Sequence, residues 1–170
     1  MDNALIPEGN ILGTVGQGNA IAMKEIGEVG RASMTAICVG ILRGCVEESV
    51  KFANDRILYG KPISKLQAIQ FHIAENRVDY EAARALLYIA AAKKDQGIPT
   101  TVDFGMAKFF AVEAAVRAAK RTIELMGGYG VMNEYAAGRF LRDAMASISS
   151  GGTSEIQKII IAGDTIKAYS

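Results

Sequence analysis

The sequence contains few of the residues that build metal or redox centres. Its 170 residues include no tryptophan, one histidine and two cysteines. Cys38 and Cys45 lie seven residues apart in what reads as one helix, about 10 Å along its axis, which excludes a disulfide between them. His72 is far from both along the chain, so no metal-ligand spacing is formed. We expect two core thiols, no metal site, and a reducing compartment such as the cytoplasm or the mitochondrial matrix.

Long apolar runs and charge of one sign are also absent. The longest apolar stretches, such as Ile159 to Ala162, fall far short of the roughly 20 residues of a membrane-spanning helix. The amino terminus shows no signal-peptide pattern. The 19 basic and 18 acidic residues are interspersed and give a net charge of +1. We therefore expect no membrane insertion and no binding of nucleic acid, and one globular domain.

Proline is scarce, whereas glycine gathers near the amino terminus. Two of the three prolines, Pro62 and Pro99, lie between runs of apolar residues at helical spacing, where they separate helices. The predicted helices cover 29–56, 65–94, 102–126, 134–147 and 154–168. The pattern predicts an all-α fold, an antiparallel four-helix bundle with an additional C-terminal helix, preceded by a short loop-rich lead-in.

Apolar spacing also predicts which helix faces are buried. In the first helix Met34, Ile37, Ile41, Val46 and Val50 recur mostly at intervals of three and four, and we expect this stripe to face the core.

In the second helix we expect charged residues such as Asp79 to face water. We also expect Ser64 and Gln67 to form a capping box at its start.

Several short segments resemble the acyl-CoA dehydrogenase family in both order and spacing. These segments are RILYGKPI at 56–63, QAIQ at 67–70, LMGGYG at 125–130, GRFLRDA at 138–144 and GTSEIQ at 152–157. The stretch at 138–144 is most similar to the branched-chain, isovaleryl-type subgroup. The lead-in at 6–13 resembles the exit from the family's middle β-domain, so the resemblance covers nearly the whole chain.

The resemblance implies a three-domain flavoenzyme that oxidises an acyl-CoA to its 2,3-enoyl form. Residues 28–170 would be its C-terminal helical bundle, and residues 1–27 a remnant of the middle β-domain with a linker. The implied cofactor is FAD, and the implied partners are an acyl-CoA substrate and an electron-transfer flavoprotein or similar acceptor. The bundle would form the core of a homotetramer, and the isolated fragment would be inactive.

Site residues follow from the same resemblance. Arg56, Tyr59 and Gln67 match positions that contact the neighbouring subunit's FAD, although a solvated arginine and a capping glutamine are alternatives. Gly127 and Gly128 match a glycine pair approached by the dinucleotide, although a simple helix stop explains them too.

The remaining matches lie near the two ends of the predicted bundle. Thr153 matches a flavin-contacting threonine and also reads as an ordinary N-cap, with Glu155 in the first helical turn beside it. Arg31 matches an arginine near the acyl-CoA entrance. Glu28 stands where the family often has an acid, although a solvated first turn explains it as well.

The sequence departs from the family at the positions of the catalytic base and at two other positions within the family-like region. The catalytic glutamate of many members corresponds to Gly151, and that of the branched-chain and long-chain subgroup corresponds to Gly30. Neither can accept a proton, so no catalytic residue is assigned. Glu124 replaces a usual glutamine near the FAD diphosphate, and Leu58 replaces a usual hydroxyl residue.

These departures leave alternatives open. The leading hypothesis is an FAD-dependent acyl-CoA dehydrogenase whose base comes from elsewhere. A flavoenzyme that acts on acyl-CoA without removing an α-proton, and an inactive paralogue used for assembly, are the alternatives.

Overall fold

The computed structural model describes residues 2–170, apart from the side chain of Glu28. The long helices are α2 (Arg31–Asp55), α3 (Gln67–Asp95), α4 (Thr101–Met126), α5 (Ala137–Ser147) and α6 (Ser154–Tyr169). The short helical elements are α1 (Gly18–Glu25), the π-helical η2 (Ile26–Gly30) and the 3-10 turns η1 (Glu8–Asn10), η3 (Ile63–Lys65) and η4 (Gly127–Val131). A small antiparallel hairpin, β1 (Ile57–Leu58) and β2 (Lys61–Pro62), joins α2 to α3.

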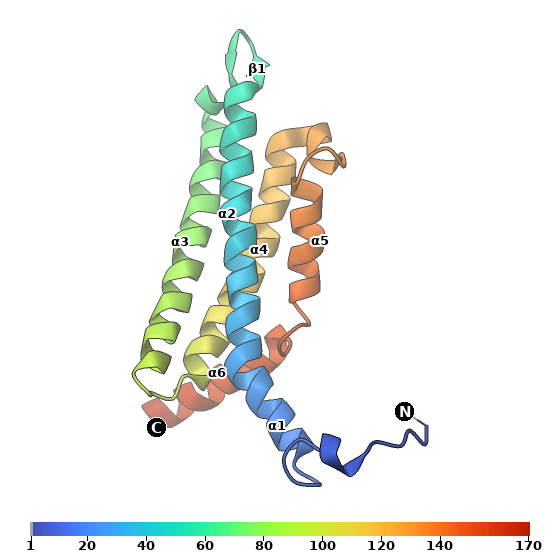
Figure 1. Ribbon diagram of the computed structural model, residues 1–170. Coiled ribbons are helices and arrows are strands. Elements are labelled where there is room, and N and C mark those ends of the chain that lie inside the picture. The colour runs from blue at the N-terminus through green and yellow to red at the C-terminus, as the bar shows by residue number, and fades with distance from the viewer. Residues whose placement is uncertain (1) are drawn as a thin grey trace.

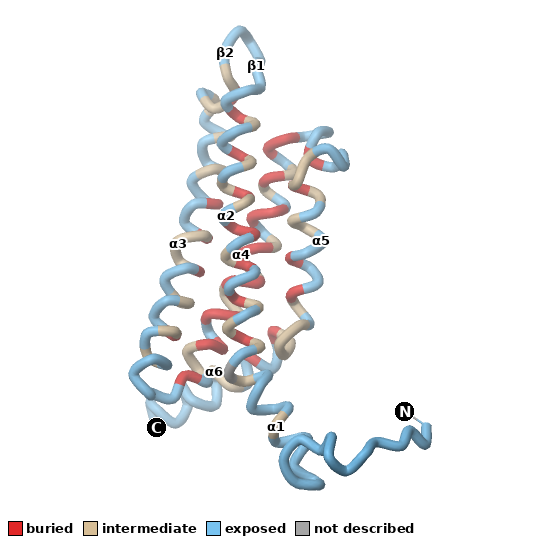
Figure 2. The backbone as a smooth tube through the Cα atoms, in the orientation of Figure 1, coloured by how far each residue is buried: buried red, intermediate tan, exposed pale blue. Residues whose placement is uncertain are grey.

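Helices α2 to α5 form an antiparallel bundle, and α6 crosses its lower end (Figure 1). Helix α4 lies at the centre and packs against α2, α3, α5 and α6. Its inner positions carry alanines without any exposed surface, namely Ala107, Ala111, Ala114, Ala115, Ala118 and Ala119. Small side chains let neighbouring helices approach closely, and Figure 2 shows the buried residues concentrated along this axis. The expected all-α bundle with an additional C-terminal helix is confirmed.

The lead-in contains more helix than its glycine content suggested. Helix α1 begins at Gly18 and continues through η2 into α2, ahead of the predicted start at Val29. Glycine costs about 0.5–1 kcal/mol in a helix interior, which weakens the sequence signal without forbidding the helix. All described residues from Asp2 to Ala20 are exposed, and this segment projects away from the bundle (Figures 1 and 2).

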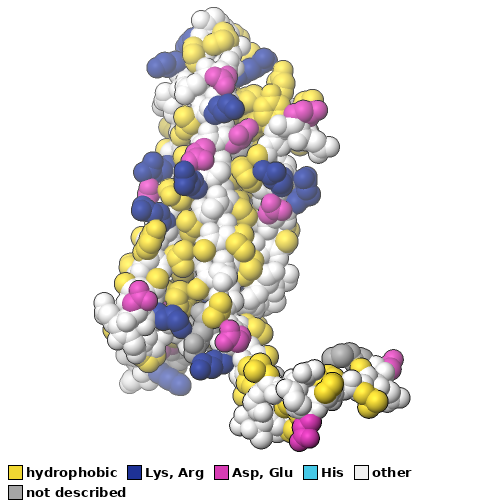
Figure 3. Space-filling model, viewed as in Figure 1, with side chains coloured by type: hydrophobic (Ala, Val, Ile, Leu, Met, Phe, Trp, Pro, Cys, Tyr) yellow, Lys and Arg dark blue, Asp and Glu magenta, His cyan; other side chains and the backbone are white. Residues whose placement is uncertain are grey.

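The buried face of α2 differs from the predicted apolar stripe. Small residues such as Thr35, Cys38 and Cys45 face the core, while Ile37 is 51% exposed and Val50 is 38% exposed. The expectation was therefore wrong for these two residues, because close packing against α4 selects small side chains. Ile41 of the predicted stripe is buried, as is Leu42, whereas Ile37 and Val50 lie on the outer face, and Figure 3 shows hydrophobic atoms among charged ones on the surface of the bundle.

Helix α3 also departs from two expectations. Asp79 does not face water: it is 8% exposed and forms ion pairs with Arg117 and Arg121 of α4, at 3.0 and 2.9 Å. The capping box was wrong as well, because Ser64 lies in η3 and Leu66 occupies the N-cap of α3. The main-chain oxygen of Ser64 instead accepts a hydrogen bond from the side chain of Gln70.

Both cysteines are buried free thiols, as expected. None of the described helices combines the length and apolar character needed to cross a membrane.

Candidate functional site at the two ends of the bundle

The predicted site residues fall at opposite ends of the bundle. Arg56 follows the end of α2, and Arg31 begins that helix. A helix rises 1.5 Å per residue, so the two main-chain positions are roughly 37 Å apart. The end that carries the β1–β2 hairpin holds Arg56, Tyr59, Gln67, Glu124, Gly127 and Gly128. The opposite end holds Glu28, Gly30, Arg31, Gly151, Thr153 and Glu155.

At the hairpin end, a cavity of about 280 Å³ brings together four predicted cofactor residues. Its lining contains Arg56, Glu124, Gly127 and Gly128, and also Leu58. Tyr59 and Gln67 are not part of this lining: Tyr59 is 90% exposed at the tip of the hairpin, and Gln67 is exposed at the start of α3. The first four predictions thus converge on one surface, while the roles of all six residues stay predictions.

The backbone around Arg56 is fixed by hydrogen bonds, and its side chain is exposed. Its N–H donates to Phe52 O at 2.9 Å, and its carbonyl accepts from Ile63 N at 2.9 Å. The guanidinium carbon lies 5.5 Å from the centre of the Tyr129 ring, within cation–π range. This arrangement holds a positive charge at the edge of the cavity, where it suits a diphosphate.

Gly127 opens the floor of the same cavity. Its φ of +60° ends α4 in a conformation that strongly favours glycine. A Cβ atom added at Gly127 or Gly128 would meet no atom within 4 Å, so the backbone is open to an approaching ligand. The exposed carboxylate of Glu124 has Lys120 Nζ at 3.8 Å, which offsets part of its charge.

An aromatic cluster beside this cavity was missed in the sequence. The rings of Phe52, Tyr129 and Tyr135 pack with centroids 5.7 to 5.9 Å apart. Phe52 and Tyr129, with Arg56, line both the first cavity and a second one of about 410 Å³. Only Tyr129 lies within a family-like segment, LMGGYG, so the other two gave no signal.

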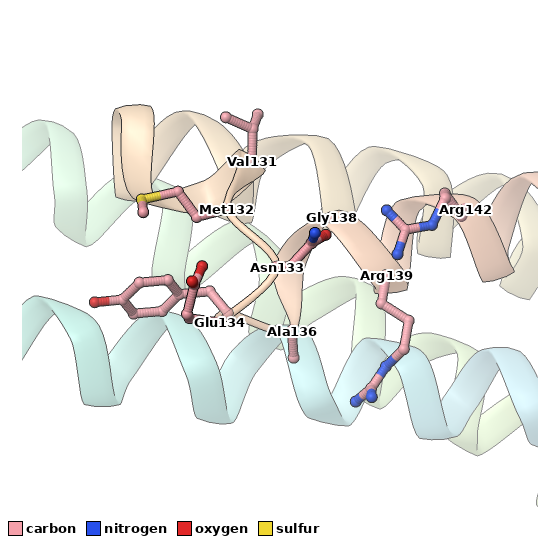
Figure 4. A pocket seen from close by; sticks show the side chains of 9 residues that line it. Val131, Met132, Asn133, Glu134, Ala136, Gly138, Arg139 and Arg142 are labelled. Atoms are coloured by element: carbon pink, nitrogen blue, oxygen red, sulfur yellow. The ribbon is translucent and has the colours of Figure 1, made fainter.

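A third cavity, of about 200 Å³, lies where the segment after η4 enters α5. Its lining includes Asn133, Gly138, Arg139 and Arg142. Figure 4 shows the side chain of Arg142 directed toward Gly138, whereas that of Arg139 points in a different direction. They do not converge on one point, so this cavity does not focus positive charge on a ligand.

At the opposite end, the two glycines at the base positions touch each other. A Cβ atom built on Gly151 would lie 3.1 Å from Gly30 O and 3.0 Å from Met34 Cγ. Gly151 has a φ of +65°, whereas Gly30 is helical with φ −60° and ψ −44°. A carboxylate introduced at either position would therefore start from the same place in the fold.

Arg31 lies buried beside this contact, with 7% of its surface exposed. Its Nη1 donates to Thr101 O at 3.4 Å, its Nε has no partner among the described atoms, and burial lowers the pKa of its guanidinium. The side chain of Glu28 lies outside the described part of the chain. Contacts of either residue with acyl-CoA stay predictions.

Thr153 has the cap role that the sequence indicated. Its Oγ1 accepts a hydrogen bond from Ile156 N at 3.4 Å at the start of α6. Glu155 is exposed, and hydrogen bonding to its own backbone N–H and to Thr153 lowers the pKa of its carboxyl. Flavin contact by either residue stays a prediction. Among the described residues, no group of three or more His, Cys, Asp or Glu side chains could hold a metal ion.

Comparison with known proteins gives a consistent assignment. The profile of the acyl-CoA dehydrogenase C-terminal domain matches residues 16–165. An acyl-CoA dehydrogenase from Bacillus subtilis is 42% identical over 161 residues, which are 95% of this chain and 42% of that protein.

Solved structures agree with this match. Butyryl-CoA dehydrogenase from Megasphaera elsdenii superposes with a TM-score of 0.89 at 36% identity, over 95% of this chain and 42% of that one. PigA with FAD and proline gives a TM-score of 0.87 at 31% identity, over 94% of this chain and 42% of that one. The chain thus spans 42% of the length of each of these proteins. Together with the fold and the motifs, the family profile, the sequence relative and the solved structures show that the chain belongs to the acyl-CoA dehydrogenase family, whose C-terminal helical domain it forms.

Proposed function

We propose that this chain is the C-terminal domain of an FAD-dependent oxidoreductase that acts on acyl-CoA thioesters. The observation that carries the proposal is the cavity lined by Arg56, Glu124, Gly127 and Gly128. It combines a positioned cation, an open glycine backbone and an aromatic wall, which together suit the diphosphate and adenosine portion of a dinucleotide. The FAD complex of the structural relative PigA supports the same cofactor.

The separation of the two ends supports a shared cofactor site. The hairpin end would bind the dinucleotide portion of a neighbouring subunit's FAD, while the end around Thr153 would lie beside the flavin of its own subunit. Each chain would then contribute to two sites, which requires a homo-oligomer, and we propose the tetramer of the family. Residues 28–170 would form its core, and residues 1–27 would lead in from a preceding β-domain.

The residues present fit FAD at both ends, and each has a definite task. Arg56 would neutralise diphosphate charge, Gly127 and Gly128 would admit the dinucleotide to the backbone, and Thr153 would orient the flavin edge by a hydrogen bond. When bound, FAD supplies a hydride acceptor for the β-hydrogen of the substrate. An electron-transfer flavoprotein or similar acceptor would then take the electrons.

Proton removal is the step for which the two positions that match the family's glutamates offer no carboxylate. Gly30 and Gly151 occupy both positions from which family members present a carboxylate. Ordinary dehydrogenation would therefore need a base from outside this domain. The presence of glycine at both positions favours a second candidate, a flavoenzyme that acts on acyl-CoA without removing an α-proton.

The proposal is tested by measuring FAD affinity in the full-length protein. Replacing Arg56→Met should weaken FAD binding by at least about tenfold, since a charge-assisted contact to phosphate is lost. Arg43→Met is the matched control, because Arg43 is an exposed arginine within α2, the helix that Arg56 follows, and pairs with Glu47 one turn away at 2.8 Å. Fluorescence titration gives both affinities, and equal values would reject the dinucleotide site.

A further inference from the structure

Lys108 is a lysine buried completely inside the bundle. It lies near the start of α4, and none of its surface is exposed. Lysine is almost never fully buried unless its charge is compensated. Here the ammonium donates hydrogen bonds to two main-chain carbonyls, Ile148 O at 3.0 Å and Gly152 O at 2.7 Å. Burial lowers the pKa of Lys108, so its position has an electrostatic cost that these carbonyls offset.

These two carbonyls mark the ends of the turn that joins α5 to α6. Within the turn, Gly151 and Gly152 both have a positive φ, +65° and +89°. Two adjacent glycines give a free chain many accessible conformations. One ammonium bonded to both ends selects the conformations in which the carbonyls converge. Gln157 Nε2 adds a second donor to Gly152 O at 3.2 Å.

The turn contains one of the two glycines at the base positions and leads directly into Thr153. Gly151 lies against Gly30, and Thr153 follows directly and caps α6. We propose that Lys108 is a positioning residue that holds the turn from Ile148 to Gly152 against α4, and thereby places Thr153 at the flavin. The placement of the turn follows from the hydrogen bonds, whereas the flavin role rests on the function proposed above.

A purely structural role makes a different prediction. If Lys108 only satisfied the last carbonyls of α5, its removal would lower stability and leave the flavin environment of the folded protein unchanged. A methionine at 108 would fill similar volume but remove the ammonium donor from Ile148 O and leave Gly152 O with Gln157 Nε2 as its side-chain donor. Arginine would keep the charge and several donors on a longer, planar group.

The experiment uses the full-length protein with Lys108→Met and Lys108→Arg. Asn76→Leu is the stability control: Asn76 is fully buried on α3, donates to Thr122 Oγ1 at 3.2 Å, and does not contact the turn. Hydrogen exchange of residues 148–156 and FAD affinity with the flavin absorption spectrum are the readouts. In Lys108→Met we expect the hydrogen-exchange rate of residues 148–156 and the FAD dissociation constant each to rise at least about tenfold more than they do in Asn76→Leu. Lys108→Arg should recover part of both effects.

The possible outcomes separate this proposal from the proposed function. If folded Lys108→Met matches Asn76→Leu in exchange and in the flavin spectrum, the positioning role is rejected. If Lys108→Met does not fold, hydrogen exchange in the unmodified protein decides. The amides of the turn from Ile148 to Gly152 should then exchange far more slowly than those of the exposed glycine-containing turn Tyr59–Gly60. Equal exchange rates in the two turns would reject the positioning role. If the full-length protein binds no FAD, the proposed function fails, while the exchange comparison still decides whether Lys108 holds the turn.

Discussion

Gly30 is the position where one substitution can best test the missing base. Its backbone is helical, and a Cβ atom there would come no closer than 3.8 Å to any neighbour. We expect Gly30→Glu in the full-length protein to fold, to keep its flavin, and to bleach with an acyl-CoA up to about 10²-fold faster than the unmodified protein. Gly30→Gln, which has the same shape without a carboxylate, should show no gain. Anaerobic stopped-flow absorbance measures both, and rapid bleaching of the unmodified protein would contradict the missing-base hypothesis.

Gly151 should not tolerate the same change. Its φ of +65° and the 3.0 Å approach of Met34 Cγ to a Cβ atom strain any other residue there, at about 1–3 kcal/mol for the backbone alone. We expect Gly151→Glu to lower the free energy of unfolding, while Gly30→Glu leaves it unchanged or slightly higher. Thermal melts of the two variants compare them directly. An equally stable Gly151→Glu protein would show that the turn adjusts more easily than its contacts suggest.

The two cysteines should be unreactive while the chain is folded. Burial raises the pKa of Cys45 to about 12 and also raises the pKa of Cys38. The thiolate is the reactive form, so neither side chain should react at pH 8 in native protein, and both should react after denaturation. A thiol-reactive dye with and without guanidinium chloride tests this. Fast labelling of native protein would mean that the middle of α2, around Cys38 and Cys45, opens often.

At the scale of elements, apolar periodicity located the long helices to within a few residues. It identified the buried face of α2 only in part, because many of the residues that α2 and α4 bury are small. Cys38 and Cys45 face inward while Ile37 faces outward, so hydrophobicity and burial are only loosely related along α2. The family-like segments predicted Arg56 and Gly127 at a common surface, whereas Phe52 and Tyr135 meet there only through tertiary packing.

The ion pairs of Asp79 join α3 to α4 and should stabilise the bundle. Removing one partner of a buried ion pair leaves the other charge uncompensated, so Asp79→Ala should lower the free energy of unfolding by about 3 kcal/mol. Glu81→Ala is a matched control on the same helix, because Glu81 also pairs with two arginines, Arg77 and Arg84, but at the surface. We expect the control to cost less than about 1 kcal/mol.

Urea denaturation at pH 7 gives both values. Similar losses in the two variants would mean that solvent reaches Asp79 more freely than its 8% exposure implies.

At the scale of the whole molecule, the outer faces of the helices predict self-association. A groove of about 560 Å³ between α3, α4 and α6 has an almost wholly apolar lining that includes Leu86, Phe110 and Ile166. Ile166 is 69% exposed. Exposed apolar surface of this kind marks an interaction site, and we expect the chain to be oligomeric at tens of micromolar.

Ile166→Asp should shift the chain toward monomer, because it places a charge in this groove. Leu12→Asp is the control, since Leu12 is 78% exposed but lies in the projecting lead-in. Light scattering together with circular dichroism reports mass and helix content. A helical, strictly monomeric unmodified chain at these concentrations would contradict the prediction.

The alanines of α4 determine how this domain responds to change. An alanine side chain has no rotamers to lose on folding, so the centre of the bundle is assembled without the entropy cost of immobilising longer side chains. For the same reason the alanine positions offer no rotamers that could adjust to a change. A methyl group added at Ala115, which has no exposed surface, would press against the side chains packed around it, and removing the existing one leaves glycine. The alanine positions of α4 thus tolerate both larger and smaller side chains poorly. The outer faces of the helices can vary more, together with the surfaces that they contact.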